Sequence, residues 1–294
     1  MNDYVLSCCS TVDLPAAQLE QRNISFVCYH YTLDGVEYPD DLGKTMNLAE
    51  FYQRLIAGAD ATTSQVSVGQ FCDYFESFLK EGRDILHISL SSGISGTYTS
   101  ACSAAEMMRA RYPERVIEVV DSLCASSGYG LFMDGAADKR DEGLSLEELR
   151  QWAEEHKTEV HHWFFSSDLH WYVKGGRVSA PAGMIGGILG ICPVLHVDDE
   201  GKLCPMAKVR TKKRAMKAML DRMKAEAVDT LGYSGKSYLC NSYCLDDAKE
   251  MAAMVEEAFP RLDGAVQICD IGTVIGSHTG PGTIALFFWG GKKR

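Results

Sequence analysis

The sequence predicts an α/β protein with two domains: an N-terminal, mostly parallel sheet covered by helices, and a C-terminal α+β domain with a mixed sheet. In the first half, apolar strand-like segments alternate with helical segments, a pattern typical of parallel sheets with both faces covered. The second half has more strand-like segments and fewer helical ones, which favours a separate α+β domain. The length of 294 residues accommodates two domains, which we place at residues 1–158 and 159–294.

The first half contains clear helix signals. Leu48–Ile56 carries a helical apolar stripe, Ser67 is a plausible N-cap, and Ser145 with Glu148 forms a capping-box pattern. The expected strands are Tyr4–Leu6, Ile24–Tyr31, Ile85–Leu90 and Val116–Val120, and the expected helices are Pro15–Gln21, Leu48–Ile56, Val68–Lys80, Ala101–Met108 and Leu146–His156.

The second half is richer in strands. Asp198-Asp199-Glu200-Gly201 separates two strand-like stretches and predicts a hairpin. We expect Ile275–Gly282 to be a glycine-rich turn and Lys292–Arg294 to be a solvated tail. The expected strands are Trp163–Ser166, Val194–Val197, Lys202–Ala207, Ser237–Cys240, Val266–Asp270 and Thr283–Trp289, and the expected helices are Lys212–Ala227 and Asp246–Ala258.

Composition excludes several classes of function. The net charge of −11 argues against a nucleic-acid partner, because affinity for phosphates comes largely from Lys and Arg. No stretch approaches 18 uninterrupted apolar residues, so we expect no integral membrane segment. The N-terminus lacks the pattern of a signal peptide, and the 11 cysteines lack paired metal-ligand spacings. We therefore expect a cytoplasmic protein with free thiols, no metal and no cofactor.

Hydroxyl-rich turns follow three of the expected strands. They contain Ser10-Thr11, then Ser91–Thr97, then Ser122 with Ser126-Ser127. Ligands of open α/β sheets bind at the carboxyl ends of the strands. The three turns therefore predict one shared binding site at that edge of the sheet.

Three chemistries fit such a site. A serine hydrolase or esterase is favoured by Gly93-Ile94-Ser95-Gly96-Thr97, followed by Asp270 and His278, although Thr97 replaces the last glycine of the nucleophile elbow. A phosphate cradle is favoured by the strand–turn–helix order, but no Lys lies in the turn. A carboxylate site would use hydroxyls and backbone N–H groups, with His278 as an added donor. Its ligand would need an apolar tunnel, which residues 180–195 could help to line.

Six motifs together resemble the DegV family, the bacterial fatty-acid-binding proteins that serve fatty acid kinases. They extend over nearly the whole chain, in order and at family-like spacing. The motifs are TTSQVS at 62–67, SLSSGISGTYTSA at 89–101, VVDSLCASSGYG at 119–130, KGGRVS at 174–179, LGICPVLHVDDEGKL at 189–203 and IGTVIGSHTGPGTIAL at 271–286.

The resemblance implies a carrier that performs no bond chemistry itself. It would bury a long-chain fatty acid and present the carboxylate to a separate ATP-dependent fatty acid kinase, and the resulting acyl-phosphate would enter phospholipid synthesis. Arg177 of the G-G-R motif would be a kinase contact. The residues implied for carboxylate binding are Thr63, Ser64, Ser95, Gly96, His278 and Thr279.

Two positions depart from the family pattern. Cys9 stands where family members usually have the Asp of an Asp-Ser-Thr turn, and Val66 replaces the proline of T-S-Q-P-S. Both changes leave the hydroxyl groups in place. We expect the first to alter hydrogen bonding at the back of the site.

Overall fold

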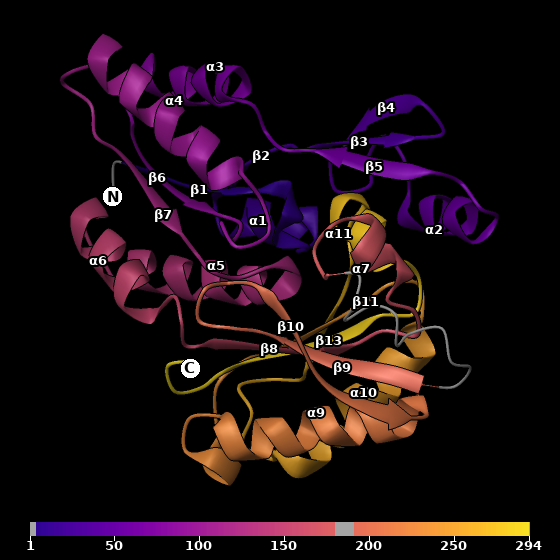
Figure 1. Cartoon of the computed structure of the whole chain (residues 1–294). Helices are drawn as coiled ribbons and strands as arrows, with labels where there is room; N and C mark the ends of the chain where they lie inside the picture. Colours follow the sequence, from indigo (N-terminus) through magenta and orange to yellow (C-terminus); the bar gives the residue numbers. More distant parts are fainter. Residues whose placement is uncertain (1–3, 180–190, 294) are drawn as a thin grey trace.

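The structure is a computed structural model that describes residues 4–179 and 191–293. Figure 1 shows the N-terminal strands and helices above a six-stranded sheet, with helix α5 between the two. All strands of the four-stranded sheet precede residue 158, and all strands of the six-stranded sheet follow it. The predicted α/β fold with a parallel N-terminal sheet and a mixed C-terminal sheet is confirmed. The domain division at residue 158 stays a prediction.

The four-stranded sheet is wholly parallel, in the order β2-β1-β6-β7. Figure 1 shows α3 and α4 on one face and α5 and α6 on the other. The strands are β1 (Tyr4–Cys9), β2 (Ile24–Val27), β6 (Asp84–Ser89) and β7 (Ile117–Asp121). The helices are α1 (Ala16–Gln21), α2 (Leu48–Ile56), α3 (Val68–Leu79), α4 (Thr97–Arg111), α5 (Ser126–Asp141) and α6 (Leu146–His156), with a 3₁₀ turn at Ser10–Val12.

The six-stranded sheet has the order β10-β9-β8-β13-β11-β12, and only β11 and β12 pair in parallel. Its side chains alternate between two cores: Ile284, Leu286 and Phe288 pack with α9 and α10, while Ala285 and Phe287 face the N-terminal half. The strands are β8 (Val160–Phe165), β9 (Ile191–Val197), β10 (Leu203–Arg210), β11 (Ser237–Asn241), β12 (Gln267–Asp270) and β13 (Ile284–Trp289). The helices are α7 (His170–Lys174), α9 (Lys212–Glu226), α10 (Leu245–Ala258) and α11 (Thr273–Thr279), with a 3₁₀ turn at Thr230–Gly232.

A third, antiparallel sheet corrects the sequence prediction for residues 24–31. The segment is not one strand, because β2 ends at Val27 and β3 (His30–Leu33) begins a separate sheet with β4 (Val36–Pro39) and β5 (Ala61–Ser64). Tyr29 anchors the break between them, since its backbone N–H donates to Ser10 Oγ at 3.1 Å. The small sheet extends beyond the parallel sheet and carries the Thr62–Ser67 motif to the site (Figure 1).

Helix α5 lies between the two large sheets, and the sequence prediction missed it. Its first nine residues are all buried, so it lacks the polar face that marks an amphipathic helix. A Cβ at Gly128 would overlap His162 and Phe287 of the six-stranded sheet. A Cβ at Gly130 would overlap Leu14 on the other side. The two glycines therefore let α5 approach both halves of the protein closely.

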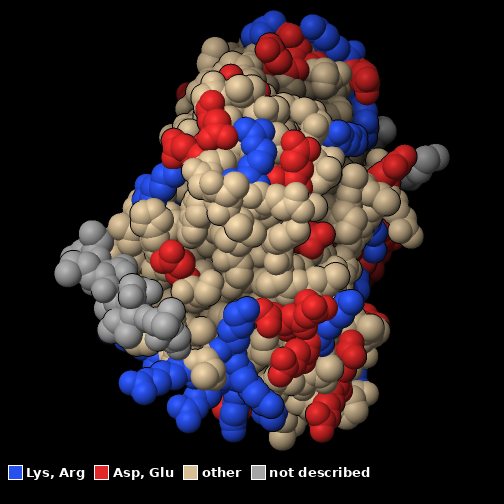
Figure 2. Space-filling view, turned by 90° about the vertical axis from the view of Figure 1, so that its right-hand side faces the viewer, with Lys and Arg blue, Asp and Glu red and all other residues tan. Residues whose placement is uncertain are grey.

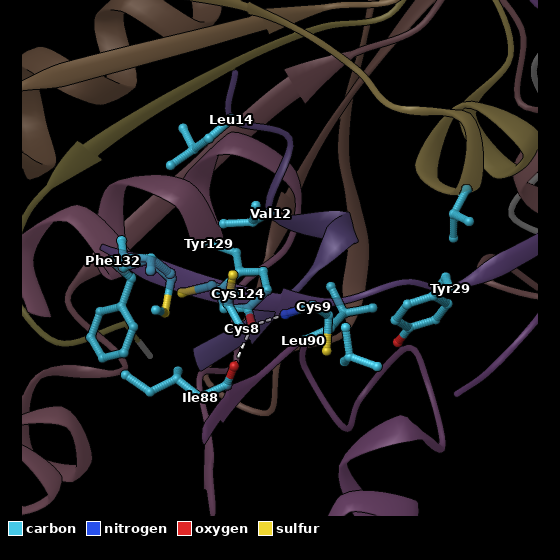
Figure 3. Close-up of a cluster of buried hydrophobic side chains, with 14 of the residues drawn as sticks. Cys8, Cys9, Val12, Leu14, Tyr29, Ile88, Leu90, Cys124, Tyr129 and Phe132 are labelled. Carbon is cyan, nitrogen blue, oxygen red and sulfur yellow. Dashed lines mark hydrogen bonds between the residues drawn. The ribbon is translucent and has the colours of Figure 1, made fainter. Parts of the chain in front are cut away.

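Tyr129 of α5 also ties this helix to the parallel sheet by hydrogen bonds. Its hydroxyl accepts the Cys9 backbone N–H at 3.0 Å and donates to the Ile88 carbonyl (Figure 3). Both partners lie in the buried cluster that Figure 3 shows. Cys9 is itself fully buried, and burial raises the pKa of its thiol to about 12, so it remains protonated.

The predicted solvated tail is confirmed for Lys292, which is exposed, but is wrong for Lys293. Lys293 is buried, and its ammonium donates to the Leu123 carbonyl at 3.2 Å. Its backbone N–H donates to the Thr158 carbonyl at 2.9 Å. Burial lowers the pKa of Lys293, and the nearby carboxylates of Asp121, Asp198 and Asp199 oppose this shift. Lys293 thus attaches the C-terminal segment to the N-terminal half.

Charge is unevenly distributed over the surface despite the net charge of −11. Figure 2 shows Lys and Arg side chains gathered low on one face, beside a group of acidic side chains, at the level where α9 and α10 lie in Figure 1. Lys212, Lys213 and Arg214, at the start of α9, are all exposed. Over residues 4–179 and 191–293, no helix is long and apolar enough to cross a membrane.

Replacing Tyr129 by Phe tests its hydrogen bonds in the core. The change leaves the buried Cys9 N–H and the Ile88 carbonyl without this partner, and we expect the free energy of unfolding to fall by roughly 1–3 kcal/mol. Urea unfolding of the variant measures this. Tyr112→Phe is the matched control, because the Tyr112 hydroxyl donates to Glu76 near the surface. Equal stability losses in the two variants would contradict the assignment.

Candidate functional site

A cavity of about 460 Å³ lies between the two halves and is lined by both. Its volume falls within the roughly 300–1,000 Å³ range of small-molecule sites. Phe164 and Phe287 line it from the six-stranded sheet, and Leu90 and Ile94 line it from the end of β6. The remaining apolar lining residues are Ala125, Val197, Leu203, Cys240, Ile271, Val274, Ile275 and Ala285.

Thr63 and His278 meet at the polar end of the cavity. Thr63 lies on β5 and His278 on α11, and Thr63 Oγ1 is 2.7 Å from His278 Nε2. Within residues 4–179 and 191–293, His278 Nδ1 has no hydrogen-bond partner, and it packs beside Gly175, where a Cβ would overlap it. Burial, with Arg177 nearby, lowers the pKa of His278 to about 4. The imidazole is therefore neutral at pH 7 and orients the Thr63 hydroxyl.

Ser95 lies in the turn between β6 and α4. Its hydroxyl is 3.1 Å from the Tyr29 hydroxyl and 3.1 Å from Thr97 Oγ1, and it accepts the Thr97 N–H at 3.3 Å. The next residue is Gly96, and a side chain at this position would overlap Gln65 of the Thr62–Ser67 motif. Two motifs that are distant in the sequence therefore form one continuous wall of donors.

Arg177 is half-buried and supplies positive charge to this wall. Its Nε donates to the Ile94 carbonyl at 3.2 Å, and Nη1 donates to the Gly175 carbonyl. Burial lowers the pKa of Arg177, yet a guanidinium stays charged at neutral pH. The side chain lines the cavity and also a second hollow of about 400 Å³ that Lys202 shares. Arg177 thus lies between the cavity and the outer surface.

Six residues are predicted from the sequence to bind the carboxylate and Arg177 to contact the kinase, and all seven line the same cavity. They are Thr63, Ser64, Ser95, Gly96, Arg177, His278 and Thr279. The structure thus brings them together, while their roles in binding stay predictions. His278 lies on a helix rather than in the expected turn, because Thr273–Thr279 forms α11 and only Gly280–Gly282 continues as a turn.

The hydrolase alternative is not supported by the geometry. A catalytic triad needs hydrogen bonds from serine to histidine and from histidine to the acid. Ser95 instead contacts Tyr29 and Thr97, and His278 contacts Thr63. Asp270 is exposed and accepts from the Asn241 amide at 3.0 Å. The three predicted triad members each have other partners, so this interpretation of Ser95, Asp270 and His278 is wrong.

The sequence analysis also missed several lining residues. Tyr29 was placed inside a strand, and nothing marked its hydroxyl as a partner of Ser95. Gln65 lies in the Thr62–Ser67 motif but was not chosen. For the predicted tunnel segment 180–195, residues 180–190 lie outside the described residues. None of Ile191–Leu195 lines the cavity, whereas Val197 and Leu203 of the β9–β10 hairpin do.

The polar lining has one sign of charge. Arg177 is a cation, His278 is neutral, and the rest of the polar lining consists of hydroxyl and amide groups with His162. Among the described lining residues there is no Asp or Glu. A cation and several donors beside an apolar wall suit a ligand with an anionic head and an apolar body.

Comparisons with known proteins agree on one family. The family model described as "Uncharacterised protein, DegV family" matches residues 9–290. A DegV domain-containing protein of Clostridium perfringens is 35% identical over 294 residues, which is 100% of both chains. A fatty-acid-binding DegV family protein from Thermus thermophilus superposes with a TM-score of 0.86 at 27% identity, covering 98% of this chain and 99% of its own.

A second solved structure of a DegV protein is also similar to this chain. DegV from Bacillus subtilis, described as a fatty acid binding protein, has a TM-score of 0.81 at 25% identity. The match covers 98% of this chain and 99% of that one.

The low pKa of His278 predicts acid sensitivity. Between about pH 6.5 and pH 4 the unfolded chain binds a proton on this residue and the native protein does not, so stability falls as pH falls. His278→Gln should flatten this dependence by up to about 1.4 kcal/mol per pH unit, and buried His87 and His162 should maintain the rest. Denaturant unfolding at several pH values measures the slope. An unchanged slope would contradict a buried, neutral His278.

Proposed function

The chain belongs to the DegV family, and from this premise we propose that it binds a long-chain fatty acid and presents the carboxylate to a separate ATP-dependent fatty acid kinase. The observation that carries the proposal is the cavity lining: a long apolar wall with hydroxyl donors and one guanidinium at one end, and no acidic side chain among the described lining residues. The protein itself would act as a carrier, with neither metal nor cofactor.

In the proposed complex, the hydroxyls of Thr63 and Ser95 donate to the carboxylate. His278 donates from Nε2–H to Thr63 Oγ1, which frees the Thr63 hydrogen for the ligand. The Tyr29 hydroxyl donates to Ser95 in the same way, and the Ser95 hydrogen, which is directed at Thr97 Oγ1 at 3.1 Å, would turn to the carboxylate. Ser64, Gly96 and Thr279 complete the polar wall.

The acyl chain would extend along the apolar part of the cavity. Removing apolar groups from water contributes roughly 0.8 kcal/mol per CH₂, so about 14 methylenes contribute on the order of 11 kcal/mol before ordering costs. Tail burial therefore supplies most of the affinity in this proposal. The head-group donors supply orientation and the preference for an acid.

The proposed kinase step forms a bond between a carboxylate oxygen and the γ-phosphorus of ATP, and releases ADP. Arg177 suits a contact in this step, because it lies at both the cavity and the adjacent outer hollow. The reaction would take place in the cytoplasm, where free thiols such as the 11 here persist. The acyl-phosphate would then enter phospholipid synthesis.

Bound lipid is the first prediction of this proposal. We expect an organic extract of the purified protein to contain a near-stoichiometric amount of a long-chain free fatty acid, since burial of the tail makes dissociation slow. Denaturing mass spectrometry identifies it, with an unrelated protein from the same host as the control. An extract without fatty acid, together with no uptake of added fatty acid, would contradict the carrier proposal.

The head-group assignment is tested by removing hydroxyls. Thr63→Ala and Ser95→Ala should each weaken fatty-acid binding by about 10- to 100-fold, the effect of losing one hydrogen bond to a charged group. Isothermal titration of delipidated protein measures this. Ser92→Ala is the matched control, because Ser92 lies in the same turn, is exposed and does not line the cavity. Unchanged affinity in the double variant would remove the assignment.

Arg177→Ala separates binding from phosphorylation. We expect the rate of acyl-phosphate formation by the kinase to fall by a larger factor than the affinity for fatty acid, because the guanidinium also faces the outer hollow. A coupled ADP-release assay and a binding titration give the two factors. Arg83→Ala is the control, since Arg83 precedes β6 and lies at the opposite edge of the sheet. If Arg177→Ala lowers only the affinity for fatty acid and not the phosphorylation rate of the bound acid, Arg177 acts inside the cavity and not as a kinase contact.

A further inference from the structure

We propose that Asp13 and Asp40 are positioning residues for the head-group end of the cavity: from the N-terminal half, they hold the start of α11 so that His278 meets Thr63. The inference rests on the proposed function, because it explains how the carboxylate site is assembled. Neither aspartate lines the cavity, so both would act through α11 rather than on the ligand.

Helix α11 is held by hydrogen bonds from the N-terminal half. The helix belongs to the C-terminal half, but its hydrogen bonds to side chains of the N-terminal half occur at both of its ends. Asp13 Oδ1 accepts the Gly272 N–H at 3.0 Å, and Asp40 Oδ1 accepts the Thr273 hydroxyl at 2.6 Å. At the other end, His278 Nε2 meets Thr63 at 2.7 Å.

Both carboxyl groups are buried in the N-terminal half. Asp13 and Asp40 are only 5% and 3% exposed. Each has a second partner on its own side: Ser126 donates to Asp13 Oδ2, and Ser10 donates to Asp40 Oδ2 at 2.7 Å. Buried carboxyl groups are costly unless hydrogen bonds satisfy them, so these four donors fix the position of both side chains.

The backbone at the start of α11 lies too close to Asp13 for a side chain to fit between them. A Cβ at Gly272 would lie 2.6 Å from Asp13 Oδ1, so only glycine allows the backbone N–H to reach the carboxylate. A hydrogen bond from the Tyr52 hydroxyl to the Ile271 carbonyl, 2.8 Å long, holds the preceding residue. A shift of α11 at its start is therefore transmitted along a single short helix to His278 and Thr63.

The test measures selectivity rather than affinity alone, using palmitic acid and hexadecanol as probes. Asp40→Ala should lose about tenfold of the acid-over-alcohol preference, the effect of misplacing one hydrogen-bond donor to the carboxylate. Alcohol binding should change much less, because the apolar wall is untouched. Asp40→Asn should retain most of the preference, since its amide oxygen can still accept from Thr273.

Two further variants sharpen the experiment. Thr273→Val removes the same interaction from the other side, so it should reproduce the loss, and combining it with Asp40→Ala should add nothing. Asp41→Ala is the matched control, because the Asp41 carboxylate bonds only to Lys44 and Thr45 beside it in the described structure. It should keep the full preference.

The outcomes separate the two proposals. If wild-type protein prefers the acid and Asp40→Ala and Thr273→Val keep that preference, the positioning role is overturned. An equal loss of acid and alcohol binding would also overturn it, since this would indicate general destabilisation. If the wild-type protein shows no preference for the acid, the proposed function itself fails, and the inference fails with it.

Discussion

The rest of the structure depends on the close packing of α5 between two sheets. The axis of a helix normally lies about 10 Å from the axis of a neighbouring helix. At Gly128 and Gly130 no side chain holds α5 away from its neighbours, which are β8 on one side and Leu14 on the other. Tyr129 lies between these glycines and binds backbone groups of β1 and β6. The helix thereby fixes the spacing of the two halves. The cavity lies between these halves, next to the N-terminal end of α5, where Ala125 and Ser126 line it.

That arrangement explains why the cavity has two chemically different ends. The apolar wall comes from side chains of the six-stranded sheet that face α5, such as Phe164 and Phe287. The polar end comes from three separate elements: the turn after β6, strand β5 of the small sheet, and helix α11. Ser95 follows β6, and Thr63 ends a small sheet that projects from the main one. One fold thus supplies burial energy and directional hydrogen bonds from separate elements.

Much of the fold and of the candidate site was predictable from local patterns. Capping residues and amphipathic stripes gave the helices Leu48–Ile56 and Leu146–His156 their predicted bounds. Hydroxyl-rich turns at the ends of parallel strands predicted one shared site, and Ser95 and Ser126 of these turns line the cavity, whereas Ser10, Thr11 and Ser122 do not. What failed depended on tertiary contacts: α5 has no polar face, and buried Lys293 is held by the carbonyls of Leu123 and Thr158, which are distant in the sequence. Tyr29 interacts with Ser95 only because the chain bends after Val27.

The neutral state of His278 shows how the polar end can favour an anion without holding much charge. A protonated imidazole would add a second cation beside Arg177, and burial makes this unfavourable. The neutral ring instead fixes one hydroxyl, and a hydroxyl donor costs far less to bury empty than a charge does. The cavity can therefore persist before a ligand arrives, and among its described lining residues Arg177 supplies the one guanidinium, at the edge nearest the outer hollow. In the proposed carrier, burial of the acyl chain supplies retention, and this weakly charged site of fixed donors supplies orientation.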